Sequence, residues 1–399
     1  KLKRKSMNKK NLRTSKFATN SVRAGTFRSS QGEHSESLYL TSSFIFQNAE
    51  EAAERFANQE AGNVYSRFTN PSVKMFEDRL AILEEAEECV ATSTGMSAIL
   101  SCIMSLCRAG DHVVVSRSVF GTTVKLFDNI LSEWGLEVSY VALSDEEQWK
   151  NSLKKNTKLF FVETPSNPLM EVCDIKFLAD LAHKNKSLLI VDNCFCTPAH
   201  QIPVRFGADI IIHSATKYLD GQGRCLGGAV LGKRSLMKKV RGFLRSAGTS
   251  MSPFNAWVLL KGLETINLRV NAQSDNAFLI AQFLENHQQI EKVFYPYLKS
   301  FEQYDLAKQQ QAKGGTVISF KIKGGKTEAY NLMNKLKIFE ISNNLGDTKS
   351  LTIHPSTTTH RILEPKEKLE QNISDNLIRL SIGLEDPEDL IQDLDSSIQ

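Results

Sequence analysis

The chain contains 399 residues with a formal net charge of +4, and 24% of the residues are charged. This length allows a large core and two domains. Eight basic residues and no acid lie among the first sixteen positions, so the remainder is slightly acidic. The composition therefore argues against a general basic surface for nucleic acid, and no apolar run approaches the length of a membrane span.

The basic N-terminus is not followed by an apolar stretch, so it does not read as a secretory signal. We expect residues 1–16 to form a disordered arm, or Met7 to be the natural start, with a mitochondrial presequence as the alternative. The seven cysteines lack disulfide-framework spacing, and the closest pair, Cys194 and Cys196, has no second pair to complete a zinc site. We predict reduced, mostly buried thiols in a cytoplasmic protein without a metal.

Residues 17–60 read as an extended arm followed by a short helix, without a core of their own. An arm that cannot bury itself is suited to docking on another subunit. Residues 62–71 are polar and turn-prone and include Tyr65 and Arg67, for which a surface loop is the simplest interpretation. Apolar residues at helical spacing then predict a helix at residues 72–87, introduced by Pro71.

Small residues at positions 91–98 open the next predicted helix, which runs towards Gly110. Free backbone N–H groups and the helix dipole make such a start suitable for an anion. The stretch is not a Walker loop, because no Gly-Lys-Ser/Thr follows. A helix cap with no ligand is the ordinary alternative.

From residue 110, strand-like runs alternate with helical stretches. The strand-like runs are residues 111–115, 137–143, 158–164, 187–193 and 208–214. This alternation predicts a mainly parallel sheet with helices on both faces, which binds ligands at the carboxyl ends of its strands. Polar residues occupy three of those ends, at Glu163–Asn167, Asp192 and Ser214–Lys217.

The stretch from Ala208 to Gly228 carries the strongest chemical signal. A β-branched run leads to Ser214, Thr216 and Lys217 on a tight loop, and four glycines follow. Hydroxyls beside a lysine suit a bound phosphate and an amine that forms a Schiff base. Taken alone, the segment fits equally well a strand end followed by a solvated lysine.

The C-terminal part predicts helices over residues 252–286 and then a smaller unit from about residue 290. Its strand-like runs are residues 316–322, 351–355 and 377–383, with helical stretches at 326–336 and 386–394. Arg379 lies inside the last apolar strand, where its charge needs a carboxylate from the protein or from a ligand.

Six blocks of the sequence resemble one known family, in the right order. They are Tyr65–Arg67, Ser93–Ala98, Glu163–Pro168, Asp192–Asn193, Ser214–Tyr218 and Arg379–Gly383. This set is similar to the Cys/Met-metabolism family of pyridoxal-phosphate enzymes. The resemblance implies an α/β fold of the fold-type I, aminotransferase-like kind, with a mainly parallel seven-stranded sheet. It also implies an arm at residues 1–60, a large cofactor domain at 61–255, and a linking helix and small domain at 256–399.

The resemblance also implies roles for individual residues. Lys217 holds pyridoxal 5'-phosphate and later acts as the base, and Asp192 pairs with the pyridine nitrogen. The remaining implied cofactor residues are Gly95, Met96, Ser214 and Thr216 at the phosphate, Phe120 on the ring, and Tyr65 and Arg67 at the phosphate of a neighbouring subunit. The implied substrate residues are Arg379, Asn167 and Asn344. A homo-oligomer with shared active sites follows, expected to be a tetramer built from dimers.

Three departures narrow the expected activity. Phe120 stands where many members carry a tyrosine, so a mechanism that uses a phenol there is in doubt. Thr122 stands where methionine γ-lyases usually carry a cysteine, and Asn343–Asp347 differs from the Glu-Ser-Leu-Gly of cystathionine γ-lyases. The chain resembles the O-succinylhomoserine sulfhydrylase subfamily most closely, which implies replacement of the succinyl group by sulfide to give homocysteine in methionine biosynthesis.

Other activities stay open at this point. Within the family they are cystathionine γ-synthase and O-acetylhomoserine sulfhydrylase. Outside it they are a cofactor-free Schiff-base aldolase and a non-catalytic binding protein. A phosphate cradle with a paired aspartate argues against the aldolase, and a reactive lysine argues against a mere binder.

Overall fold

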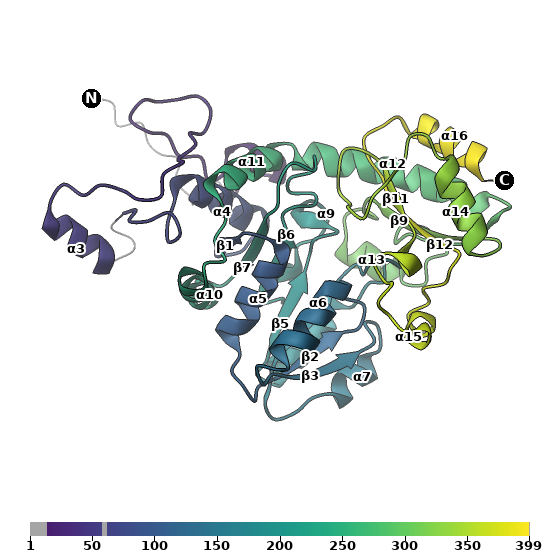
Figure 1. Cartoon of the computed structure of the whole chain (residues 1–399), viewed down its shortest axis with the longest axis horizontal. Coiled ribbons are helices and arrows are strands. Elements are labelled where there is room, and N and C mark those ends of the chain that lie inside the picture. The colour runs from purple at the N-terminus through teal and green to yellow at the C-terminus, as the bar shows by residue number, and fades with distance from the viewer. Residues whose placement is uncertain (1–13, 58–61, 399) are drawn as a thin grey trace. The chain divides into compact units, whose positions relative to one another are not determined.

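The computed structural model describes residues 14–57 and 62–398, and the chain divides into two compact units (Figure 1). The first unit contains the residues up to Leu106, Ile212–Asp220 and Arg224–Asn267, and the second contains Cys107–Ile211, Gly221–Gly223 and the residues from Leu268 onwards. Residues 1–16 were predicted to be disordered, and residues 1–13 of that stretch lie outside the described residues. The predicted domain limits at residues 60 and 255 stay a prediction.

Two β-sheets organise the chain. The larger has seven strands in the order β1-β7-β6-β5-β4-β2-β3, and the smaller has five in the order β10-β11-β12-β9-β8. Strand β2 pairs in parallel with β3 and β4, and β4 with β5, whereas β1 and β7 are antiparallel. The strands of the larger sheet are β1 (Glu88–Thr92), β2 (His112–Ser116), β3 (Glu137–Val141), β4 (Thr157–Glu163), β5 (Leu188–Asp192), β6 (Ile210–Ser214) and β7 (Gly228–Gly232). The predicted α/β class with a mainly parallel seven-stranded sheet is confirmed.

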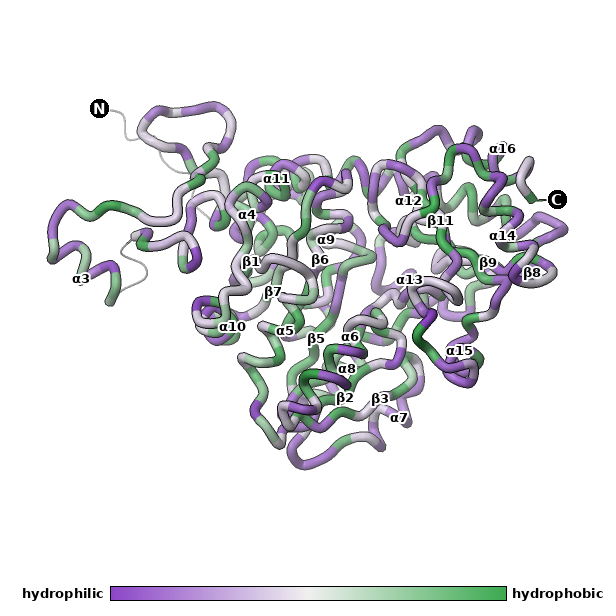
Figure 2. The backbone as a smooth tube through the Cα atoms, in the orientation of Figure 1, coloured by the Kyte–Doolittle hydropathy of each residue, from purple (hydrophilic) through white to green (hydrophobic). Residues whose placement is uncertain are grey.

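The strands of the smaller sheet are β8 (Ile290–Phe294), β9 (Val317–Ile322), β10 (Glu340–Ile341), β11 (Leu351–Ile353) and β12 (Leu377–Ser381). All the predicted strands are present in the two sheets. Strands β1, β7, β8 and β10 were not predicted. Strand β1 is short and follows acidic residues, β7 is bounded by glycines that resemble loop residues, and β10 has only two residues. Figure 2 shows the β5 segment in the hydrophobic colour, as expected for a strand whose central residues are buried.

In the first unit, helices pack against the strands that it contains. Its helices are α2 (Phe17–Arg23), α3 (Ala49–Ala57), α4 (Pro71–Leu83), α5 (Gly95–Leu106), α10 (Arg234–Ala247) and α11 (Pro253–Glu264). The predicted helix after Pro71 is confirmed as α4, and its cap is Asn70, whose side chain accepts from the Ser72 and Val73 N–H groups. The arm residues contain a helix, α2, that was not predicted. Helix α5 packs on α10 and β7, and α4 packs on β1 and α11.

Two large buried clusters lie in the second unit. One packs α8 (Ile175–Lys184) against β4 and β5. The other packs the long helix α12 (Ile266–Asn286) with β9 and β12. The remaining helices are α6 (Gly121–Leu126), which continues as a π-helix (Phe127–Leu131), α7 (Glu146–Asn151), α9 (Thr197–His200), α13 (Tyr304–Gln310), α14 (Lys326–Lys335), α15 (Pro365–Glu370) and α16 (Pro387–Ser397), with short 3-10 turns at Pro203–Phe206 and Pro355–Thr357. The predicted C-terminal helices and strands are thus present, and the separate small C-terminal domain stays a prediction.

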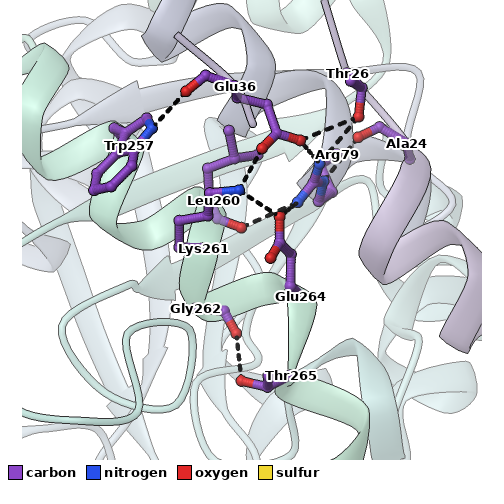
Figure 3. Close-up of polar contacts among 10 residues, drawn as sticks. All are labelled: Ala24, Thr26, Glu36, Arg79, Trp257, Leu260, Lys261, Gly262, Glu264 and Thr265. Atoms are coloured by element: carbon purple, nitrogen blue, oxygen red, sulfur yellow. Dashed lines mark hydrogen bonds and ion pairs between the residues drawn. The ribbon is translucent and has the colours of Figure 1, made fainter. Parts of the chain in front are cut away.

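Within the first unit, a network of buried ion pairs connects the arm to α4 and α11, as Figure 3 shows. Arg79 on α4 is fully buried, and its Nη2 lies 3.1 Å from Glu36 Oε1 while its Nε donates to the Ala24 carbonyl at 2.8 Å. Lys261 on α11 contacts the other Glu36 oxygen and also pairs with Glu264 at 2.9 Å. Burial alone would raise the pKa of Glu36, but the Lys261 hydrogen bond and the Arg79 charge outweigh it and lower that pKa to about 2.

Two further predictions concern the state of the cysteines and the lack of an apolar run long enough to span a membrane. All seven cysteines are free thiols; six are buried and Cys225 is half-buried, as predicted. In the parts of the chain that the structure describes, no helix combines the length and the apolar character needed to cross a membrane.

Candidate functional site

In the first unit, the start of α5 lies against the end of β6. Gly95 is the first residue of α5, and the Ser97 N–H donates to Thr94 Oγ1 at 3.0 Å in the first turn. A Cβ atom added to Gly95 would lie 2.8 Å from Ser214 Cβ. This approach requires a glycine at position 95, and it brings the predicted phosphate residues Gly95 and Ser214 together.

The loop after β6 carries the predicted lysine. Strand β6 ends at Ser214, whose carbonyl accepts from the Lys217 N–H at 3.2 Å. Thr216 Oγ1 accepts from the Gly227 N–H at 3.1 Å, which fixes the hydroxyl in the loop. A Cβ on Gly228 would lie only 2.0 Å from the Thr94 carbonyl oxygen, so the backbone on both sides of this loop is closely packed. Hydroxyls, a helix N-terminus and a lysine amine therefore belong to one compact region of the first unit.

Tyr65 and Arg67 lie in a surface loop, as predicted. Tyr65 is exposed and forms an isolated bridge with Ser43. The Arg67 guanidinium lies 4.8 Å from the centre of the Phe68 ring and donates to the carbonyl oxygen of Arg245. Arg245 also stacks on Phe68, at 4.2 Å. Two cations therefore share one ring, and these contacts neutralise neither charge.

In the second unit, two acidic residues lie at the ends of neighbouring strands, and the Phe120 backbone contacts one of them. Glu163 and Asp192 are register neighbours at the ends of β4 and β5, and the Phe120 N–H donates to Glu163 Oε2 at 2.9 Å. The Cys194 N–H donates to Asp192 Oδ1 at 3.0 Å. Burial and the neighbouring Asp192 charge raise the pKa of Glu163 well above its usual range. Asp192 is half-buried, as a residue that meets a ligand would be.

The predicted substrate residues of the second unit are in contact with one another. Arg379 in β12 is buried, and its Nη1 donates to Asn167 Oδ1 at 3.0 Å. Its Nη2 donates to the Asn344 carbonyl at 3.1 Å. These two hydrogen bonds to neutral oxygens orient the guanidinium in β12.

Two residues near these contacts had no assigned role in the sequence. Glu163 was noted only as part of a polar strand end. His360 is buried, and burial together with the Arg379 charge lowers the pKa of His360 to about 4, so its ring is neutral at pH 7. The sequence signal for Glu163 is its place directly after an apolar run, and the signal for His360 is its place directly after a Thr-rich run.

A cavity of about 630 Å³ in the second unit has polar walls that include Arg117, Glu171 and Lys292. Asn167 also lines it, but Asp192, Phe120 and Arg379 do not. We therefore do not assign this cavity to the candidate site.

The residues fit pyridoxal phosphate. A phosphate needs N–H and O–H donors, which the start of α5 and the hydroxyls of Ser214 and Thr216 supply within the first unit. The glycine at position 95 allows the helix start and Ser214 to approach closely, as a phosphate cradle requires. Lys217 supplies an amine, and Asp192 supplies a carboxylate at a strand end.

Comparisons with known proteins agree with this chemistry. Residues 18–399 match the family described as "Cys/Met metabolism PLP-dependent enzyme". An O-succinylhomoserine sulfhydrylase of Pseudomonas aeruginosa is 53% identical over 95% of this chain and 94% of its own length. An L-methionine gamma-lyase of Treponema denticola is 40% identical over 98% of this chain and 99% of its own length.

The fold comparison gives the same result. A Campylobacter jejuni structure, assigned as an O-acetylhomoserine (thiol)-lyase, superposes with a TM-score of 0.92 at 33% identity, covering 96% of this chain and all of its own (100%). That structure contains N'-pyridoxyl-lysine-5'-monophosphate. The family match spans nearly the whole chain, and the residues expected to hold the cofactor are present. The chain therefore belongs to the Cys/Met metabolism family of PLP-dependent enzymes.

Proposed function

We propose that this chain catalyses γ-replacement on an O-acylhomoserine, with O-succinylhomoserine and sulfide as substrates and homocysteine and succinate as products. The observation that carries the proposal is the 53% identity, over almost the full length, to an O-succinylhomoserine sulfhydrylase. Phe120 and Thr122 support it, because they replace the tyrosine and cysteine expected of other family activities. In this role the enzyme serves methionine biosynthesis in the cytoplasm.

The chain's own residues would divide the work as follows. Pyridoxal phosphate, when bound, supplies an electron sink that makes the protons next to the amino group acidic. Lys217 holds the cofactor through its amine and, once released, moves the proton at Nζ. Asp192 keeps a proton on the pyridine nitrogen, and Arg379, oriented by Asn167, holds the substrate α-carboxylate.

The remaining predicted residues complete this assignment. The Gly95 and Met96 amides and the hydroxyls of Ser214 and Thr216 bind the phosphate. Phe120 packs on the cofactor ring but cannot exchange a proton, so proton transfer falls to Lys217. Asn344 helps to orient Arg379 through its carbonyl.

Substrate comparison tests the proposal. Purified protein reconstituted with pyridoxal phosphate should show a near-visible absorbance band. Its kcat/KM should be highest for O-succinylhomoserine with sulfide, compared with the acetyl ester and with cysteine as the nucleophile. Faster reaction with cysteine would assign the chain as a cystathionine γ-synthase, and preference for the acetyl ester would assign it as an O-acetylhomoserine sulfhydrylase.

We also propose that the active unit is a homo-oligomer, with a tetramer built from dimers as its expected form. The arm exposes large apolar side chains: Ile45 is 94% exposed, and Leu40 and Phe56 are also exposed. The paired cations Arg67 and Arg245 suit the phosphate of a neighbouring subunit. Mixing Arg67→Ala with Lys217→Ala protein should restore activity, because one site of a mixed dimer carries neither defect. No recovery despite subunit exchange would mean that Arg67 serves its own chain.

A further inference from the structure

The contact between Phe120 and Glu163 has no role in the reaction proposed above. The two residues are 43 positions apart, and the Phe120 N–H donates to Glu163 Oε2 at 2.9 Å. Glu163 is only 5% exposed, whereas the Phe120 side chain is 39% exposed. Phe120 is also the cap residue before α6, and its own side chain makes no capping hydrogen bond. A buried carboxyl therefore accepts a hydrogen bond from the backbone of a residue whose side chain is partly exposed.

Glu163 also lies next to Asp192. The two are paired in the parallel register of β4 and β5, and the Thr164 N–H donates to the Asp192 carbonyl at 3.4 Å. Register neighbours on parallel strands point to the same face of a sheet about 4.8 Å apart, so two ionised carboxylates here would repel. Burial and the Asp192 charge raise the pKa of Glu163 well above its usual range.

We propose that Glu163 is a positioning residue for the cofactor ring: its Oε2 fixes the Phe120 backbone, and through it the ring that packs on pyridoxal phosphate. This inference rests on the proposed function, which places Phe120 on the cofactor. The Phe120 side chain is 39% exposed, so the hydrogen bond to its backbone is one contact that fixes where the ring lies. Glu163 touches neither substrate nor cofactor in this role.

Two substitutions separate the hydrogen bond from the charge. Glu163→Gln keeps an acceptor oxygen for the Phe120 N–H in a side chain of the same size, so it should bind pyridoxal phosphate within about twofold of wild type. Glu163→Leu removes the acceptor and leaves the Phe120 N–H unpaired, which should weaken cofactor binding by about tenfold. The measurements are the pyridoxal phosphate dissociation constant of the apoprotein and the visible circular dichroism of the bound cofactor. A glutamine variant as impaired as the leucine variant would overturn the proposal, because charge and not the hydrogen bond would then matter.

Glu171 provides the matched control. It is half-buried, its pKa is also raised by burial, and its Oε2 accepts from Ser118 Oγ at 3.1 Å on the loop that leads to Phe120. Glu171→Leu should leave the cofactor dichroism unchanged. Equal changes in Glu171→Leu and Glu163→Leu would show a general loosening of the loop and would contradict a specific role of Glu163.

A double-mutant cycle tests whether the effect passes through the ring. Phe120→Leu removes the ring and keeps the N–H, so adding Glu163→Leu to it should cost less than twofold in cofactor affinity. A tenfold cost in both backgrounds would overturn the link to the ring. The wild-type titration separates the two proposals: no near-visible band in wild type refutes the proposed function, whereas a normal band with an unaffected Glu163→Leu variant refutes only this inference.

Discussion

The Arg79 network and the Glu163–Asp192 pair are both groups of charged side chains, but they are built in opposite ways. Around Arg79, two cations and two carboxylates alternate at hydrogen-bond distance, and the fully buried guanidinium meets Glu36 and Glu264 (Figure 3). At the ends of β4 and β5, two carboxyls are neighbours in register.

This difference indicates what each group is for. Opposite charges at close range lower the cost of burying each other, so the Arg79 network holds the arm to α4 and α11. Burial and the neighbouring Asp192 charge raise the pKa of Glu163, an unfavourable arrangement that is expected where a charge serves a ligand. We therefore expect substitutions in the first group to change stability and substitutions at the candidate site to change turnover.

The largest expected effect is at the candidate site. Lys217→Ala should abolish turnover and the near-visible absorbance of the covalently held cofactor, because no other amine takes its place. Thermal unfolding should stay close to wild type. Lys233→Ala, at an exposed lysine just before α10, is the control and should retain both signals. Wild-type-like turnover in Lys217→Ala would contradict the assignment of Lys217 as the residue that holds pyridoxal phosphate.

The next effect should be on folding alone. Arg79→Met should lower the free energy of unfolding by about 3–5 kcal/mol, because Glu36 would keep its burial but lose a cation. Urea denaturation measures this change. Lys74→Met, which breaks an ion pair of a half-exposed lysine with Asp78, should cost less than about 1 kcal/mol. Similar losses in the two variants would mean that burial does not distinguish these charges.

Asp192→Asn should show the reverse pattern. We expect kcat/KM to fall at least a hundredfold, which is about 2.7 kcal/mol of barrier, because a neutral amide holds the pyridine proton poorly. The stability of the apoprotein should be unchanged or higher, since the charge next to the buried Glu163 carboxyl is removed. Asp174→Asn, at the cap of α8, should leave activity unaffected. A clear loss of stability with normal kinetics would identify Asp192 as a cap for the Cys194 N–H.

The smallest effect concerns Glu36 and pH. Its folded pKa of about 2 lies below the unfolded value, so the stabilisation is present above about pH 4.5 and is lost as the pH falls towards 2. After allowance for solvent screening, Glu36→Gln should destabilise the protein by about 2 kcal/mol at pH 7. Denaturation curves at pH 7, 5 and 3 should show the gap between variant and wild type closing. A constant gap would mean that packing, and not charge, accounts for the loss.

The sequence predicted those features that depend on local patterns. Apolar β-branched runs indicated β2 to β6, and polar residues directly after them indicated Asp192 and Lys217 as candidates. The Arg79 network was not predicted, because its partners come from the arm and from α11, far away in the sequence. The role of Glu163 was missed for a similar reason: its partner is a backbone N–H, which every residue except proline carries and no sequence pattern marks.

The burial of the cysteines has a consequence for the chemical durability of the enzyme. Burial raises the pKa of Cys107 and Cys173 to about 12, and burial together with Asp220 raises that of the half-buried Cys225 to about 11. At pH 7, a thiol with a pKa of about 11 is ionised in only about one molecule in ten thousand, and the thiolate is the nucleophile that attacks peroxides and sulfane sulfur. The low thiolate fraction of these three cysteines therefore makes them poorly reactive towards oxidation and persulfidation at neutral pH.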